Sequence, residues 1–218
     1  MLTGKETVDY FLESSSFSNY TVVKIKSGNS KCIFKPSGKT IIELTEQHHD
    51  SNKIDDIFVG AHEAAHALIY NSDNNYFKRI KKSVKIYLGL FFLMHFADIF
   101  ALFFITNMFL KIALILTYNL ILYTYAKIHG PLIENDESRA DDLALQLIIE
   151  NLISFLQKEN NNIEIIKTKI KQCYQIRNEK IKKRSASINI VTLSWIFSFK
   201  FILIAIKIFP RYMDLRVY

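Results

Sequence analysis

The stretch Val59-Gly60-Ala61-His62-Glu63-Ala64-Ala65-His66-Ala67-Leu68 contains the pattern His-Glu-x-x-His. Residues four apart on an α-helix lie one above the other on the same face. His62 and His66 can therefore offer two imidazole nitrogens to one metal ion, with Glu63 beside them near a metal-bound water. The remaining residues of the stretch are small or apolar. They predict a buried helix, which we expect to run from residue 54 to about residue 70.

A catalytic zinc ion usually takes three protein ligands and leaves a fourth position for water. The further histidine that extends this pattern in some zinc enzymes is absent, so we expect a carboxylate from later in the chain. Glu137 and Asp141 open an apolar-periodic helix that is predicted to run to about residue 158, and they are again four residues apart. One can bind the metal, and we assign that role to Glu137. Asp141 would then orient a ligand histidine from behind. Glu134 and Asp136 are alternatives to Glu137 as the ligand.

Composition points to a membrane rather than to nucleic acid. Half of the 218 residues are hydrophobic and the net charge is +7, with the positive residues concentrated beside apolar runs. That distribution is typical of membrane topology signals, so no nucleic-acid partner is expected. The two cysteines, Cys32 and Cys173, form no Cys-x-x-Cys pattern and suit a reducing compartment. The first 20 residues contain no apolar core that would predict a signal peptide.

The segment before the histidine motif combines a short helix with strands. Thr3 and Glu6 have the spacing of a capping box, which predicts a helix over residues 3–14. Strands are predicted near residues 20–26, 32–35 and 40–44, the last two flanking the turn signal Pro36-Ser37-Gly38. We expect residues 40–44 to be the sheet edge that pairs with an extended peptide substrate. A strand with no substrate role is an equally good interpretation.

A long apolar stretch from residue 86 to residue 128 follows five positive charges in residues 78–85. It is long enough for two membrane-spanning helices of about 20 residues each, expected near 86–106 and 109–127. Asp98 would cost about 3 kcal/mol at the bilayer centre, but thirteen Leu, Ile and Phe residues at about 0.3–0.6 kcal/mol each outweigh it. Asp98 and His95, one turn apart, could form a polar site within the bilayer or a helix-packing contact.

The hairpin determines the expected topology. An even number of crossings returns the chain to the side it left, so the two histidines and Glu137 end on one side. The basic run places that side, and the site, at the cytoplasmic face of the cell membrane. A charged amphipathic helix is expected over residues 163–184. A third apolar stretch, residues 188–206, is expected to be a further span or an interfacial helix.

At this point the sequence resembles the YugP-like family of membrane-bound neutral zinc metallopeptidases. The resemblance rests on the order of Leu2-Thr3-Gly4, a short β segment, the His-Glu-x-x-His helix, an apolar hairpin and Glu137-Ser138-Arg139-Ala140-Asp141. It implies a gluzincin-type site in which Glu137 binds zinc and Asp141 supports it. The family often has glycine where Ala65 stands, and it usually begins with an additional apolar anchor.

The sequence thus predicts a mainly α membrane protein with a small N-terminal α+β portion and a zincin-like active-site helix. The expected divisions are 1–77, 78–130, 131–184 and 185–218. The expected function is that of a multi-pass membrane metalloendopeptidase with one Zn²⁺ per chain, a peptide or protein substrate, and Glu63 as general base. Candidates for oxyanion support are Tyr70, His129 and Arg139. The alternative is a non-catalytic membrane scaffold with a structural zinc site, which a fourth protein ligand such as His129 or Asp141 would favour.

Overall fold

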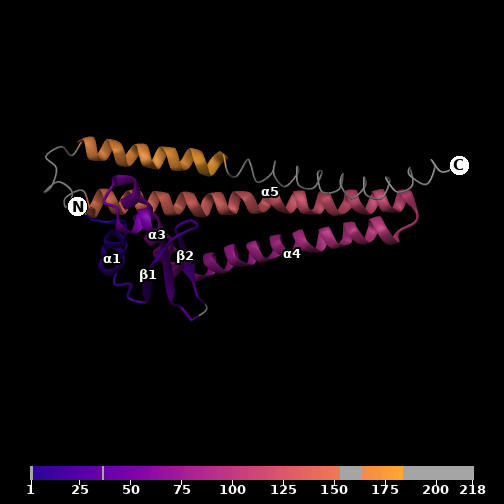
Figure 1. Ribbon diagram of the computed structural model, residues 1–218, viewed down its shortest axis with the longest axis horizontal. Coiled ribbons are helices and arrows are strands. Elements are labelled where there is room, and N and C mark those ends of the chain that lie inside the picture. The colour runs from indigo at the N-terminus through magenta and orange to yellow at the C-terminus, as the bar shows by residue number, and fades with distance from the viewer. Residues whose placement is uncertain (1, 36, 153–163, 184–218) are drawn as a thin grey trace. The chain divides into compact units, whose positions relative to one another are not determined.

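The computed structural model describes residues 2–35, 37–152 and 164–183 (Figure 1). The chain divides into two units. The first combines Met1–Lys78 with Asn135–Lys182, and the second contains Arg79–Glu134. The first unit is therefore made of two segments that flank the second unit in the sequence. The predicted third apolar stretch, residues 188–206, lies outside the described residues.

The first unit begins with helix α1, Gly4–Ser14, which has the predicted capping box. The backbone N–H of Thr3 donates to Glu6 Oε2 at 2.8 Å, and the N–H of Glu6 donates to Thr3 Oγ1 at 3.2 Å. These two bonds satisfy backbone donors that the first turn of a helix leaves without intrahelical partners. The apolar face of α1 is fully buried and consists of Val8, Phe11 and Leu12.

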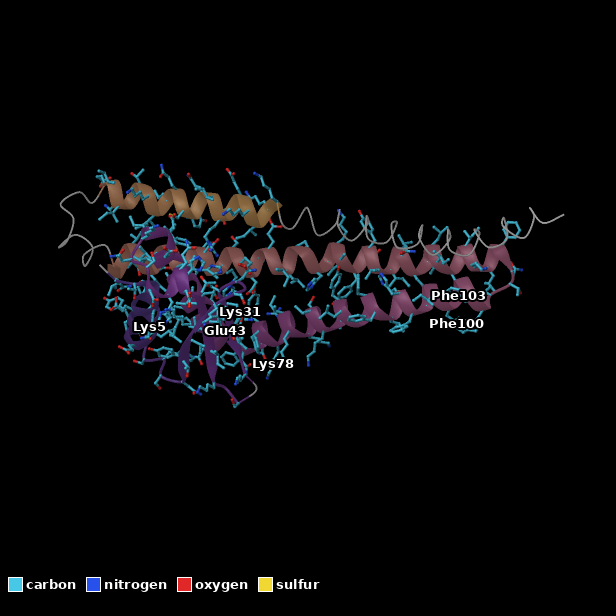
Figure 2. The ribbon with its side chains drawn as sticks, in the orientation of Figure 1. Lys5, Lys31, Glu43, Lys78, Phe100 and Phe103 are labelled. Carbon is cyan, nitrogen blue, oxygen red and sulfur yellow. The ribbon has the colours of Figure 1, made fainter. Side chains whose placement is uncertain are left out.

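A three-stranded sheet follows, built from β1 (Tyr20–Ile25), β2 (Lys31–Phe34) and β3 (Thr40–Thr45). The strand order is β1-β3-β2, with β3 parallel to β1 and antiparallel to β2. Lys31 and Glu43 face each other across the β2–β3 ladder in a 3.0 Å ion pair, and Figure 2 shows their side chains on these neighbouring strands. Alternate residues of β3 are buried, which gives the sheet one face toward the core.

The sheet order corrects the expectation that residues 40–44 form the substrate-binding edge. Strand β3 is hydrogen-bonded on both sides, so its backbone has no free edge for a peptide. The edge strands of this sheet are β1 and β2. The hydrophobic pattern identified a half-buried strand correctly but carried no information about its neighbours.

Helices α2 (Glu46–Asp50) and α3 (Ile54–Ser72) complete the N-terminal part. Helix α3 is the predicted motif helix and is buried along most of its length. It packs against α1 at an unusually close approach, because a Cβ added to Gly60 would lie only 2.4 Å from the carbonyl oxygen of Gly4. The fully buried Ile57 and Phe58 of α3 join Ile42 and Leu44 of β3 in the core of this unit.

Two long helices form the hairpin of the second unit: α4, Asn74–Phe104, and α5, Met108–Leu147, joined by residues 105–107. Their middle parts pack through Met94 and Leu122, with Tyr87, Leu90, Phe91 and Tyr118 around them. Both helices are long and apolar enough to cross a membrane by length and composition, with mean hydropathies of 1.6 and 1.5. Their outer faces carry exposed aromatic side chains, including Phe100 and Phe103 near the far end of α4 (Figure 2).

Helix α5 corrects a second expectation, that a new helix opens at Glu137. The helix instead runs without a break from Met108 through Pro131 to Leu147 and ends in a π-helical turn, Ile148–Leu152. Glu137 and Asp141 therefore lie in a helix interior rather than at a helix N-terminus. The predicted amphipathic helix is confirmed as residues 164–183.

Candidate metal centre

Helix α3 places two imidazole rings side by side in the interior of the first unit. The ring centroids of His62 and His66 are 4.6 Å apart and the planes are nearly perpendicular. Both residues are buried, at 3% and 6% exposure, and so is Glu63 between them at 5%. The four-residue spacing and the small alanines beside the histidines produce this arrangement, as the sequence predicted.

Helix α5 contributes a carboxylate to the same place. Oε2 of Glu137 lies 3.4 Å from Nε2 of His62. One ligand atom from each of His62, His66 and Glu137 lies within 4.8 Å of the others, and within the described parts of the chain these three are the group that could hold a metal ion. Ligand atoms around one tetrahedral zinc ion are about 3.4 Å apart, since each lies about 2.1 Å from the metal. Two imidazoles and a carboxylate are also a donor set found in catalytic zinc sites. The residues therefore fit a zinc ion.

The acidic residues around Glu137 occupy different positions. Oδ1 of Asp141, which is completely buried, lies 2.7 Å from Nδ1 of His62, on the opposite side of the ring from Glu137. Asp136 lies behind the other histidine, with Oδ2 3.9 Å from Nδ1 of His66. Each histidine thus has a carboxylate near Nδ1. Asp136 is bonded by Tyr70 and is too far from His66 for a hydrogen bond, whereas Glu137 is the carboxylate that groups with the two histidines.

The charges of two of the three clustered residues, His66 and Glu137, suit metal binding. Burial lowers the pKa of His66 to about 3, helped by the charge of His62, so its imidazole is neutral. Burial acts to raise the pKa of Glu137, but hydrogen bonding from His62 and the charges of both histidines outweigh it and lower that pKa to about 2. Glu137 is therefore ionised at neutral pH. A neutral imidazole and an ionised carboxylate are the forms that bind metal.

The pKa values of His62 and Glu63 each result from effects that act in opposite directions. Burial lowers the pKa of His62, but the carboxylates of Asp141 and Glu137 more than offset it, and the pKa is raised to about 9. Burial raises the pKa of Glu63 to about 7, against the lowering effect of the His62 charge and of a hydrogen bond from the backbone of Cys32. That hydrogen bond shows that strand β2 lies beside Glu63.

The three residues considered for oxyanion support have other contacts. The hydroxyl of Tyr70 donates to Asp136 Oδ2 at 2.5 Å, and its ring lies 5.4 Å from that of His66. The guanidinium of Arg139 lies 4.2 Å above the ring of Tyr76. His129 belongs to the second unit, where its Nδ1 is 2.8 Å from Ser83 Oγ. Of the three, Tyr70 is the one placed against a histidine of the cluster.

A family model described as "putative neutral zinc metallopeptidase" matches residues 1–154. The chain belongs to this neutral zinc metallopeptidase family. The match contains the histidine motif, the hairpin and the carboxylate segment, which supports zinc as the metal of the cluster. No curated protein and no solved structure matches the chain.

Sequence reasoning missed one residue of this site, Arg177 in the helix of residues 164–183. Its Nε donates to Asp141 Oδ1 at 2.8 Å. A signal was present, because Arg177 follows the buried Ile166 and Ile170 at helical spacing and so lies on the buried face of a lysine-rich helix. Because the segment contains many positive residues, the sequence reasoning treated it as uniformly charged and did not single out Arg177.

Proposed function

We propose that the chain is a zinc-dependent endopeptidase of the membrane in which His62, His66 and Glu137 hold the metal. The observation that carries the proposal is the convergence of three ligand atoms within 4.8 Å from two segments separated by the hairpin. A zinc ion bound there would polarise the scissile carbonyl and activate a water molecule for attack. The structural-zinc alternative gains no support, because the described residues supply three ligands to the cluster and Asp141 lies behind His62.

Glu63 has the position and the chemistry of the general base. It follows His62 on the same buried helix, and burial raises its pKa, which makes the carboxylate a stronger base than an exposed one. In the proposed reaction a water oxygen bonds to the scissile carbon and Glu63 takes the proton that the water loses. Glu63 then gives that proton to the leaving nitrogen as the carbon–nitrogen bond breaks.

Strand β2 replaces residues 40–44 as the proposed peptide-binding edge. It is an edge strand of the sheet, and the backbone of Cys32 within it bonds to Glu63. A peptide that adds to this edge would lie alongside the metal cluster. Methylating substrate backbone nitrogens next to the scissile bond should then raise KM. An unchanged KM for every methylated position would exclude strand pairing.

The hairpin supports attachment to the cell membrane with the cluster at the cytoplasmic face. Helices α4 and α5 are long and apolar enough to cross, and the basic residues 78–85 precede the apolar part of α4. We expect the protein to stay in the membrane fraction after an alkaline carbonate wash. Release into the supernatant would contradict two spanning helices.

The test of the catalytic proposal is Glu63→Gln in the full chain, assayed for bound zinc and for hydrolysis of a peptide library. We expect zinc to be retained and hydrolysis to fall by about 100-fold or more. Glu164→Gln is a matched control, because the Glu164 side chain is 82% exposed. Hydrolysis by Glu63→Gln at the wild-type rate would remove Glu63 from the chemistry.

A further inference from the structure

The helix of residues 164–183 reaches the metal centre although it lies beyond the family match, which ends at residue 154. Two isoleucines attach this helix to the first unit: Ile166 and Ile170 are 4% and 1% exposed. Arg177 lies two turns further along the same face, with its guanidinium carbon 5.8 Å from the centre of the buried Phe58 ring. The helix therefore brings one partly buried arginine beside α3.

Arg177 and His62 both lie close to the same oxygen atom of Asp141. Oδ1 of Asp141 accepts a hydrogen bond from Arg177 Nε at 2.8 Å and lies 2.7 Å from Nδ1 of His62. Asp141 has no solvent exposure, so water cannot compensate its charge. A buried carboxylate without a partner is strongly unfavourable. Arg177 provides the compensating charge through its hydrogen bond to Oδ1.

We propose that Arg177 is a positioning residue of the metal centre and acts through Asp141. This inference rests on the proposed zinc site. With Oδ1 fixed by Arg177, the carboxylate can hold the His62 ring so that Nε2 faces Glu137, 3.4 Å away. Groups that orient a metal-binding histidine in this way tune metal affinity about 10–100-fold. The functional metal site therefore extends to residue 177.

A competing effect predicts the opposite sign. The positive charge of Arg177 lies near the proposed metal position and would repel a dication, so its removal could strengthen zinc binding. The direct contact with Asp141 argues against this outcome, because the charge of Arg177 is already paired with that carboxylate. The direction of the change in zinc affinity therefore separates positioning from simple repulsion.

The experiment measures zinc affinity of the full chain by competition with a chelator, and the absorption spectrum of the cobalt-substituted protein. Arg177→Met should weaken zinc binding by about 10-fold or more and alter the cobalt spectrum. Lys171→Met removes the same charge from an exposed position of the same helix and should leave both unchanged. Arg177→Lys keeps the charge without the planar fork and should lie between them.

A double-mutant cycle tests whether Arg177 acts through Asp141. In an Asp141→Asn background, Arg177→Met should add less than about a two-fold change, because the shared contact is already lost. Zinc binding by Arg177→Met at least as tight as wild type, or a full additive loss in the Asp141→Asn background, would overturn the proposal. If Arg177→Met does not fold, wild-type affinity and spectrum in Arg177→Lys would overturn it. Failure of the peptidase proposal would appear separately, as wild-type chain that binds zinc but cleaves no peptide.

Discussion

Replacing Gly60 by alanine is expected to destabilise the first unit, although alanine is the better helix former. Gly60 lies in the interior of α3, two residues before His62, where α3 passes close to the backbone of Gly4 in α1. In an open helical position the substitution would gain up to about 1 kcal/mol from helix propensity. The sign of the effect therefore depends on what the added methyl group meets.

The steric cost of the added methyl group can be derived from the structure. The new Cβ would lie 2.4 Å from the carbonyl oxygen of Gly4 and 3.1 Å from its Cα. An ordinary carbon–oxygen contact is about 3.3 Å or longer, so the two helices must separate by nearly 1 Å. Both contacts involve backbone atoms, and no side-chain rotation can relieve them. Overpacking costs about 1–3 kcal/mol, and a backbone contact this short belongs to the upper part of that range, about 2–3 kcal/mol. After a propensity gain of about 1 kcal/mol, the net loss is about 1–2 kcal/mol.

The measurement is thermal unfolding of the purified chain in detergent, together with zinc affinity. A loss of 1–2 kcal/mol lowers Tm by about 2–8 °C in a chain of this size. Zinc binding should also weaken, because moving α3 displaces His62 relative to Glu137. Gly89→Ala is the matched control: it is also in a helix, but its Cβ meets no atom within 4 Å. We expect unchanged or higher stability there. A Gly60→Ala protein as stable as wild type would refute the close-packing argument.

Three further predictions concern the reactivity of Cys173, the Tyr70–Asp136 hydrogen bond and the effect of metal removal. Burial, together with the hydrogen bond to Asp55, raises the pKa of Cys173 to about 12. Less of the reactive thiolate is therefore present at pH 8, and iodoacetamide should label Cys173 at least about 10-fold more slowly than free cysteine. Labelling should be faster in the Asp55→Asn variant. Labelling of the wild type at the free-cysteine rate would contradict the raised pKa. Tyr70→Phe removes the 2.5 Å bond to the buried Asp136 and should cost about 1–3 kcal/mol in thermal or denaturant unfolding, whereas an unchanged midpoint would show that the bond contributes nothing. Chelation of the metal should lower Tm of the wild type, by an amount corresponding to about 2.7 kcal/mol if zinc is present at 100 times its Kd. Chelation should have little effect on Tm of a His66→Ala variant. Equal decreases in Tm in both proteins would place the metal elsewhere.

Local sequence signals predicted the elements that form the site. The capping box of Thr3 and Glu6 marked the start of α1, and the four-residue histidine spacing placed both rings on one face of α3. The choice of Glu137 depended on chemistry as well as on pattern, because a third ligand was required and Glu137 and Asp141 have the spacing of a metal ligand and a carboxylate that supports a ligand histidine. The structure brings that residue to the histidines.

Features that depend on contacts between distant residues were not predictable in this way. The alternation of β3 shows that Ile42 and Leu44 share a buried face, but it contains nothing about which strands flank it. The parallel pairing with β1 depends on how the chain crosses between them. A new helix was expected to open at Glu137, yet that residue lies within α5, which begins at Met108 and continues through Pro131. Proline costs a helix one hydrogen bond, but a helix held by other contacts can accept that loss.

The proposed metal centre requires the chain to reverse direction between His66 and Glu137. His66 and Glu137 are separated by the whole of the second unit, and the first unit exists only because the chain returns to it at Asn135. A metal ion held by both segments closes that long loop, so zinc should stabilise the first unit by linking its two halves in addition to neutralising Glu137. Because one apolar helix leads away from His66 and one leads back to Glu137, two membrane crossings would leave all three ligands on one side. One crossing or three would separate them, so the turn at residues 105–107 has to be present for the site to form.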